Sequence, residues 1–392
     1  DAVALARTAF LPARAAARGW RLANPLTATA FLDRAAVAGE IPPSWTARPM
    51  FDLQRIRKLM QPGAFGAMDG LLGDTARLLK TPGFSAERPI SASGLRELLE
   101  CPHRFLLARL LGWREPGDVP GAASIVDPAP YGTLFHALVE EFFREYGTPF
   151  GRRERTLVHW QGIGAALADA AFRQLLGSYP LSGEGATDQQ RKRLLEDMAS
   201  YLKREWEGER RRYVGVEKPF GWADDPVALT VGKRQLFVHG SIDRLDVEGD
   251  TVLVRDVKTG KAHPRTGDEQ GPVPVLDVQV GLYGLVLSKM AGTWKLPARV
   301  AVAYEYVGRG EGRREFVADY EVLARATMNW LKTATALLAE GRFPRTPNAD
   351  PDCRYCSFLP VCGDEGAARA PQVLANSTGA LALFQTLKDA EE

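Results

Sequence analysis

The sequence lacks several features that mark particular classes of protein. No run of about 18 apolar residues occurs, so a membrane-spanning helix is not expected. The opening residues do not have the pattern of a secretory signal or a transit peptide. No Gly-x-x-x-x-Gly-Lys-Ser/Thr motif is present, so the chain has no phosphate-binding loop of that type for ATP. These absences predict a cytoplasmic protein without a membrane partner and without its own ATP-driven motor.

Net charge and cysteine are also scarce. The net charge is +2 and the pI is about 8.3, so any nucleic-acid surface must be a local basic groove rather than a field over the whole protein. The chain has 392 residues, of which 45% are hydrophobic and 25% charged, and this composition predicts a folded chain of two or more compact units. Disulfides between the 4 cysteines are disfavoured by the expected cytosolic context.

Three segments are expected along the chain. Residues 1–88 have a mainly helical pattern and carry no motif with evident chemistry. Residues 89–365 mix helical and strand patterns, which predicts an α/β domain, and residues 366–392 are expected to form a C-terminal tail. Because the chain begins with Asp1 rather than Met, we expect it to be a piece of a longer protein.

The stretch 236–260 is expected to organise the rest of the chain. Apolar and polar residues alternate with period two on both sides of Gly249 and Asp250, which predicts a β-hairpin with a two-residue loop. If Glu248 pairs with Thr251, the register of the whole hairpin follows by counting outward along the two strands.

This register predicts a site with three charged side chains. Asp243 lies opposite Asp256, and Lys258 shares the face of Asp256. Two carboxylates with Cβ atoms ~5 Å apart repel each other, and a divalent metal would neutralise them. Oxygen ligands favour Mg²⁺ or Mn²⁺. The alternatives are an exposed hairpin with ordinary surface charges, or a slip of one residue that sends the aspartates to opposite faces.

Other candidate site residues lie outside the hairpin. His136 is on the polar side of a strongly amphipathic helix expected over residues 131–146, and Glu217 is on a strand that precedes the hairpin. A helix after the hairpin places Gln279 and Tyr283 on one face. The charged run 201–213 has mixed signs, which is typical of a solvated helix.

The four cysteines have the spacing of a metal centre. Cys353, Cys356 and Cys362 can surround one centre, and Cys101, at a helix break, is the remaining cysteine that can supply the fourth thiolate. Zinc and an iron–sulfur cluster both accept four thiolates, and the spacing alone favours zinc.

Taken together, these motifs resemble one nuclease family. The set Gly240-Ser-Ile-Asp-Arg244, Asp256-Val-Lys258 and Gln279-x-x-x-Tyr283, preceded by the helix with His136, resembles the RecB-like branch of the PD-(D/E)XK nucleases. The four cysteines resemble those of its iron–sulfur subgroup, which includes AddB-type subunits of bacterial helicase–nucleases. The family's proline before the first aspartate is not matched, since Ile242 stands there.

The resemblance implies a restriction-endonuclease-like core, with a central mixed sheet flanked by helices, and a role for each residue. The metal ligands would be His136, Asp243, Asp256 and the backbone carbonyl of Val257. Lys258 would orient the attacking water, Glu217 is a weaker site candidate, and Gln279 and Tyr283 would position DNA. A [4Fe–4S] cluster on Cys101, Cys353, Cys356 and Cys362 would tie the domain shut, with zinc as the alternative.

The implied function is Mg²⁺- or Mn²⁺-dependent hydrolysis of DNA, single-stranded or with a free end, by an exonuclease. The first context is an AddB-like helicase–nuclease that acts in DNA end processing and recombinational repair. Residues 1–88 would then be a remnant of a larger helicase-like chain, and a helicase subunit or domain would be the partner. Two alternatives are a stand-alone or CRISPR-adaptation-type nuclease, and a non-catalytic DNA-binding module stabilised by its cluster.

Overall fold

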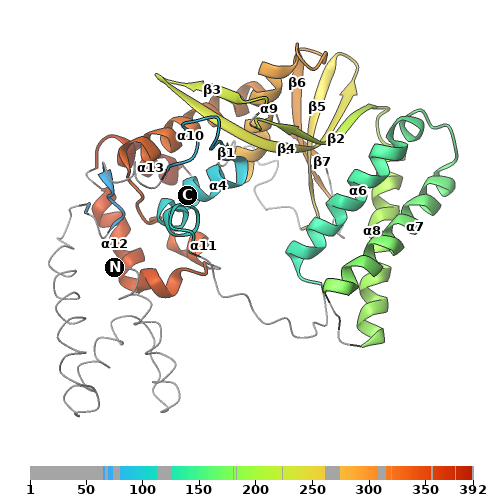
Figure 1. Cartoon of the computed structure of the whole chain (residues 1–392), viewed down its shortest axis with the longest axis horizontal. Helices are drawn as coiled ribbons and strands as arrows, with labels where there is room; N and C mark the ends of the chain where they lie inside the picture. Colours follow the sequence, from blue (N-terminus) through green and yellow to red (C-terminus); the bar gives the residue numbers. More distant parts are fainter. Residues whose placement is uncertain are drawn as a thin grey trace. The chain divides into compact units, whose positions relative to one another are not determined.

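The computed structural model describes most of the chain after residue 80, and Figure 1 labels its helices and strands. The described residues are 65–66, 69–73, 80–113, 126–179, 181, 183–222, 224–260, 274–307, 315–318, 320–354, 356–375 and 377–390. Most of the region 1–88 that was expected to be helical lies outside these ranges, and residues 82–88 form turns and bends. Among the described helices, none is both long and apolar enough to cross a membrane.

The chain divides into two compact units. The unit that we call the sheet unit comprises residues 82–96 and 116–331. The cysteine unit comprises residues 1–81, 97–115 and 332–392. The segment boundaries predicted near residues 89 and 365 remain predictions.

The long strand β4 (Arg234–Glu248) is the centre of the sheet unit. Its first half pairs with β3 (Val227–Val231) and, in parallel, with β1 (Ile90–Ser91). Its second half lies between β2 (Arg212–Phe220) and β5 (Thr251–Lys258), and both pairings are antiparallel. One strand therefore holds four neighbours in place, and the candidate residue Asp243 lies in the second half of β4, next to the first residue that pairs with β5.

The hairpin between β4 and β5 has the predicted register. Glu248 pairs with Thr251, and Gly249 in the loop has a φ of 59°. Glycine adopts this left-handed conformation without the steric cost that a Cβ would bring. The alternation of apolar residues and the loop glycine therefore suffice to specify the hairpin.

The other edge of the sheet is built by a crossover connection. Strand β5 pairs in parallel with β6 (Arg299–Tyr306), and a parallel pair needs a long connection, which α9 (Pro274–Met290) supplies. Strand β7 (Glu315–Ala318) then adds to β6 in the antiparallel sense, and α10 (Tyr320–Glu340) follows. The sheet is mixed, as the family resemblance implies.

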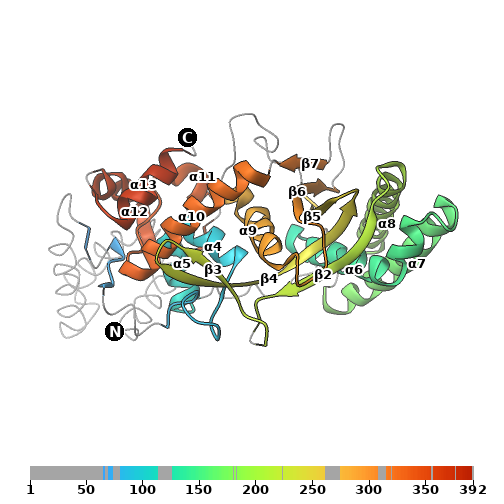
Figure 2. The same ribbon diagram turned by 90° about the horizontal axis from the view of Figure 1, so that it is seen from above.

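Three helices form a layer beside β2, as Figure 2 shows. They are α6 (Pro128–Gly151), α7 (Leu157–Ser178) and α8 (Glu184–Glu207). Their shared core is rich in aromatic rings, and Val257 of the hairpin packs into it. Burial of this apolar stripe places α6, and with it His136, next to the second half of β4.

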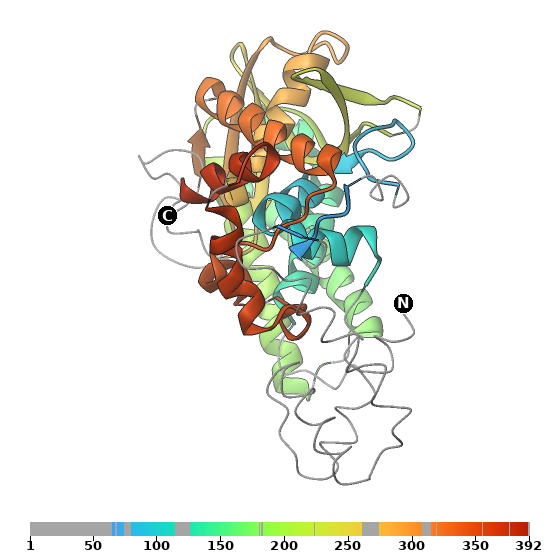
Figure 3. The same ribbon diagram turned by 90° about the vertical axis from the view of Figure 1, so that its left-hand side faces the viewer.

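The cysteine unit is helical. It contains α5 (Pro102–Phe105), the π-helix η3 (Leu106–Leu110), α11 (Ala349–Cys353), α12 (Leu359–Leu374) and α13 (Ala380–Asp389). Figure 3 shows the blue-green segment of α5 beside the red helices from the end of the chain. In the segment 366–392, expected to be a tail, the described residues include the end of α12 and then α13, whose apolar face is buried.

The helix break expected at Cys101 is present. Helix α4 (Ala92–Glu100) ends just before Cys101, whose backbone is extended with a φ of −150° and a ψ of 100°. Pro102 then opens α5, as expected for a residue whose ring fits the first helical turn but not a helix interior. The break leaves the Cys101 side chain buried in the cysteine unit.

Candidate active site

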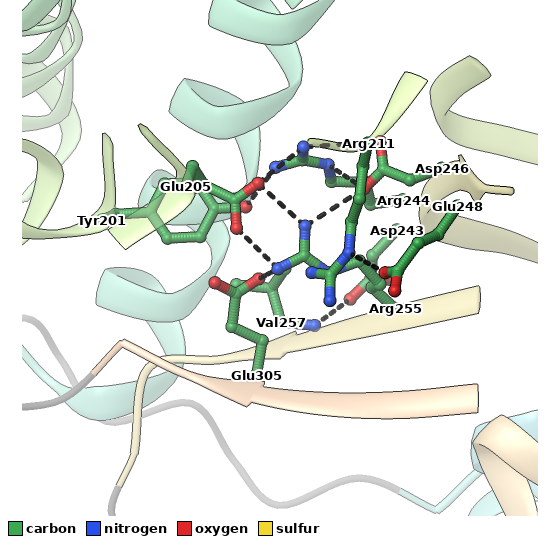
Figure 4. Close-up of polar contacts among 10 residues, drawn as sticks. All are labelled: Tyr201, Glu205, Arg211, Asp243, Arg244, Asp246, Glu248, Arg255, Val257 and Glu305. Carbon is green, nitrogen blue, oxygen red and sulfur yellow. Dashed lines mark hydrogen bonds and ion pairs between the residues drawn. The ribbon is translucent and has the colours of Figure 1, made fainter. Parts of the chain in front are cut away.

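The hairpin brings its two aspartates together. The regular pairing of β4 with β5 ends at Arg244 and Arg255, and Asp243 and Asp256 are the next residues on the two strands. Beyond this point a side-chain contact takes the place of backbone pairing between the strands. Oδ2 of Asp243 accepts a hydrogen bond of 3.0 Å from the backbone N–H of Val257 (Figure 4). The structure thus agrees with the count made outward from the loop.

Asp256 is a carboxylate with 0% of its surface exposed. Its Oδ2 lies 2.6 Å from Nζ of Lys258 in an ion pair, but neither oxygen makes a hydrogen bond to any described residue. A buried carboxylate without hydrogen-bond donors costs several kcal/mol unless another cation compensates it, on the order of 2–7 kcal/mol even for a neutral polar group. The chemistry of Asp256 therefore fits a divalent metal ion.

His136 and Glu217 join Asp243 to form a group that can hold a metal ion. One ligand atom from each of the three lies within 4.8 Å of the others. Nδ1 of His136 is 3.5 Å from Oδ2 of Asp243 and 3.9 Å from Oε1 of Glu217. These three ligand candidates converge from α6, β2 and β4, and Asp256 of β5 is not a member of this group.

Glu217 reaches this group through a strained backbone. Its φ is 44°, which is unusual for a residue with a side chain and costs about 1–2 kcal/mol. On either side of it the pairing of β2 with β4 is regular, with Val216 opposite Arg244 and Lys218 opposite Ile242. Strain of this kind concentrates at functional sites, where the surrounding structure imposes it. No sequence pattern indicates a positive φ at this position, so the sequence alone supports Glu217 only weakly as a site residue.

Two substitutions of Glu217 should distinguish the effect of its carboxylate on metal binding from the effect of its strained backbone on stability. Both Glu217→Ala and Glu217→Gly should weaken Mn²⁺ binding at least about tenfold. Loss of a residue that merely supports a metal ligand lowers metal affinity by about 10–100-fold, and loss of the ligand itself should cost at least as much. Glu217→Gly should be more stable than Glu217→Ala by about 0.5–1 kcal/mol, because glycine relieves the positive φ. Calorimetric Mn²⁺ titration and chemical denaturation measure the two effects. Equal stability of the two variants would contradict the strain.

Burial controls the protonation of the group. Burial, followed by the negative charge of Asp256, raises the pKa of Asp243 well above its usual value. Burial lowers the pKa of His136, against the opposing effect of the charges on Asp256 and Glu217. A neutral imidazole is the form that binds metals, and a bound divalent cation would favour the charged form of Asp243. The donor set of oxygens and one nitrogen suits Mg²⁺ or Mn²⁺.

Gln279 and Tyr283 are connected to Lys258 by hydrogen bonds. Nζ of Lys258 donates to Oε1 of Gln279 at 3.4 Å, and Nε2 of Gln279 donates to the hydroxyl of Tyr283 at 3.3 Å. The Tyr283 ring packs edge-on against Phe220 with centroids 5.7 Å apart. Burial raises the pKa of Tyr283 far above neutrality, so its hydroxyl stays protonated. Gln279 and Tyr283 of α9 therefore border the site at Lys258.

A cluster of buried charges supports the two strands that carry the aspartates (Figure 4). We define this buried charge cluster as Tyr201, Glu205, Arg244, Asp246, Arg255 and Glu305. The Arg255 guanidinium lies 2.5 Å from Glu205, 3.0 Å from Asp246 and 2.8 Å from Glu305. Arg244 lies 2.7 Å from Glu205 and 2.9 Å from Asp246. These contacts join β4, β5, β6 and α8.

The buried charge cluster was not expected from the sequence. Glu205 belongs to the mixed-sign run 201–213 that was predicted to be solvated, yet its side chain is only 8% exposed. That expectation was wrong at this position, because two buried arginines draw the carboxylate into the interior. Arg244 follows Asp243 and Arg255 precedes Asp256, so the cluster fixes the register of the strands at the aspartates.

The cysteine unit contains a separate pocket lined by all four cysteines. They are Cys101, Cys353, Cys356 and Cys362, and Arg104 and Arg345 also line it. Burial raises the pKa of the Cys101 thiol to about 12 and that of Cys353 to about 11. Among the described residues, however, no three of these sulfurs lie within 4.8 Å of one another. The structure therefore shows a shared pocket and does not show a formed metal centre.

Comparisons with known proteins bear on the same residues. A sequence profile of the PD-(D/E)XK nuclease superfamily matches residues 89–363. No curated protein matches the chain. Among solved structures, the chain is similar to a protein from Eubacterium rectale described as a candidate exonuclease, with 8% identity, a TM-score of 0.36, and coverage of 71% of this chain and 94% of that one. Because the profile spans well over half of the sequence and includes every residue of the candidate site, this chain belongs to the PD-(D/E)XK nuclease superfamily.

Proposed function

We propose that this chain is a metal-dependent deoxyribonuclease that hydrolyses phosphodiester bonds as an exonuclease. The observation that carries the proposal is the buried Asp256 carboxylate, paired with Lys258 and placed next to Asp243 with no hydrogen-bond donor of its own. An exposed hairpin with ordinary surface charges, the alternative raised by the sequence, would leave this carboxylate in water. Family membership makes DNA the substrate class.

The proposed ligands are His136, Glu217, Asp243 and Asp256, with the Val257 carbonyl as a further one. A Mg²⁺ or Mn²⁺ ion at these residues would lower the pKa of a bound water and offset the charge of the scissile phosphate.

Other residues of the site would act on the attacking water and on the DNA strand. Lys258, held by Asp256 and Gln279, presents a compact cation that can hydrogen-bond the attacking water or a phosphate oxygen. Gln279 and Tyr283 fix the direction of the Lys258 amine and border the path of the DNA strand.

Cleavage assays test this function. End-labelled single-stranded and double-stranded DNA, and a circular DNA without ends, are incubated with the full chain in EDTA, in Mg²⁺ and in Mn²⁺. We expect cleavage of the linear substrates in either metal, an intact circle, and no cleavage in EDTA. Cleavage of the circle would replace the exonuclease assignment by an endonuclease one. If no substrate is cleaved, the alternative function of a non-catalytic DNA-binding module would be favoured.

The biological context is proposed on the sequence resemblance. An AddB-like helicase–nuclease that processes DNA ends in the cytoplasm, during recombinational repair, is the context we favour. The chain has no phosphate-binding loop of the Gly-x-x-x-x-Gly-Lys-Ser/Thr type, so a helicase motor would be a separate domain or partner. A stand-alone or CRISPR-adaptation-type nuclease is the alternative context.

We also propose that the four cysteines bind a [4Fe–4S] cluster. They line one pocket, and the cationic Arg104 and Arg345 beside them would compensate an anionic thiolate centre. The resemblance to the iron–sulfur subgroup is the ground on which we favour the cluster over zinc, and the role of the cluster would be structural.

Loss of Cys101 tests this centre. Cys101→Ala should lower the melting temperature of the cysteine unit and the iron content together, because a metal centre contributes its binding free energy to folding. Protein purified without oxygen should be brown, with about four iron and four sulfide per chain. A colourless protein with one zinc per chain would contradict the cluster and leave the nuclease proposal unaffected.

A further inference from the structure

The open face of β4 carries a row of half-buried residues that ends at the candidate metal site. Positions Phe237, His239, Ser241 and Asp243 are partly exposed, as is Gly240, whereas Leu236, Val238 and Ile242 are buried. Alternate residues of a strand share one face, so the four odd-numbered positions lie on the same side of β4. At a rise of ~3.3 Å per residue, His239 lies ~13 Å from Asp243 along this face.

Trp222 covers His239 within this row. The two rings have centroids 4.6 Å apart at an interplanar angle of 62°. Although it makes this contact, Trp222 remains 56% exposed, and it belongs to a small set of large hydrophobic residues exposed in the described part of the chain. A tryptophan held half in water keeps apolar ring surface free for another flat group.

The backbone fixes this tryptophan in position. Gly221 has a φ of 74°, and a Cβ there would lie 1.9 Å from the carbonyl oxygen of Val238, so the chain passes directly against β4. The carbonyl of Trp222 accepts a hydrogen bond of 2.9 Å from the N–H of Asp225, which closes a turn. The exposed ring is thus presented by a tight turn on the sheet.

The residues around Trp222 favour contact with a nucleobase over contact with a phosphate group. Asp224 and Asp225 follow it in the exposed turn, so the local charge repels a phosphate group. An aromatic face stacks with any nucleobase, and this contact does not depend on sequence. Bases in a duplex are already stacked and paired, so the ring can receive only an unpaired base.

We propose that Trp222, supported by His239, is a stacking platform for an unpaired base of the DNA strand whose phosphate reaches the metal site. This proposal rests on the proposed nuclease function and extends it to single-stranded DNA or opened ends as the preferred substrate. The distance of ~13 Å to Asp243 corresponds to about four nucleotides at a stacked spacing of ~3.4 Å, and to fewer in a stretched strand.

Binding measured in EDTA tests the platform without cleavage. Trp222→Ala should weaken the binding of a fluorescent single-stranded oligonucleotide about tenfold, and Trp222→Phe should retain most of the affinity, because base stacking on a ring is lost only in the first variant. Double-stranded DNA without frayed ends should bind both variants like the wild type. Val158→Ala, at a residue on α7 that is 77% exposed, is the matched control and should have no effect.

A scan with abasic nucleotides locates the contact. In the wild type, one abasic position within about four nucleotides of the scissile bond should reproduce the tenfold loss, and in Trp222→Ala it should cost nothing further. Equal binding by the wild type and Trp222→Ala, or an abasic effect that persists in Trp222→Ala, would overturn the platform. If Trp222→Ala does not fold, the scan in the wild type decides alone. A Trp222 effect in a protein that cleaves nothing would retain the platform and refute the nuclease.

Discussion

Asp256→Asn and Lys258→Ala are each expected to lower the rate of metal-dependent DNA cleavage by at least about 10²–10³-fold. The first removes the charge of a proposed metal ligand, and the second removes the cation placed 2.6 Å from that carboxylate. Single-stranded DNA binding in EDTA should change little, because neither residue lies on the Trp222 platform. Initial rates on end-labelled DNA, measured with the same preparation that is used for binding, provide the comparison.

Stability distinguishes these variants from simple misfolding. Asp256→Asn replaces a buried charge by a neutral group of the same shape, so its fold should be at least as stable as the wild type in EDTA. Lys192→Ala, at a lysine of α8 whose side chain is 78% exposed, is the control and should cleave DNA at the wild-type rate. Wild-type cleavage by both Asp256→Asn and Lys258→Ala would refute the site.

Arg255→Met is expected to lower the free energy of unfolding by about 3–5 kcal/mol. The Arg255 guanidinium is 1% exposed and contacts Glu205, Asp246 and Glu305, so its removal leaves three buried carboxylates with Arg244 as the remaining arginine of the cluster. Breaking a buried ion pair costs far more than breaking an exposed one, because the partner charges stay out of water. Urea denaturation followed by circular dichroism measures the change.

The control for this variant lies on the same layer of helices. Lys203 pairs with Glu207 on α8 at 3.8 Å, and the two side chains are 58% and 60% exposed. Lys203→Met should change stability by less than about 0.5 kcal/mol. A loss below about 1 kcal/mol in Arg255→Met would show that the buried charge cluster is not what holds β4, β5 and β6 in register.

Local pattern was sufficient to predict the hairpin and its carboxylates. Side chains repeat every second residue, and Gly249 favours the loop, so the positions of Asp243, Asp256 and Lys258 follow from counting. The amphipathic stripe of α6 and the crossover helix α9 were likewise predicted from periodicity.

Contacts between distant segments could not be predicted in this way. His136 reaches Asp243 only because α6 packs beside the second half of β4, and no local period encodes that packing. The positive φ of Glu217 is imposed by its surroundings. Glu205 looked like one more charge on a solvated helix, because its buried partners Arg244 and Arg255 lie about 40 and 50 residues further along the chain.

The most direct measurement is the binding of Mn²⁺ to the wild type and to an Asp243→Asn/Asp256→Asn double variant, with cleavage of single-stranded DNA followed in the same samples. Electron paramagnetic resonance reports free Mn²⁺, so its loss of signal counts bound ions. We expect the wild type to bind at least one Mn²⁺ per chain and cleavage to rise with occupancy, and the double variant to lose both. Wild-type cleavage that persists in EDTA, or a double variant that still binds Mn²⁺ and cleaves DNA, would contradict a metal-dependent nuclease at this site.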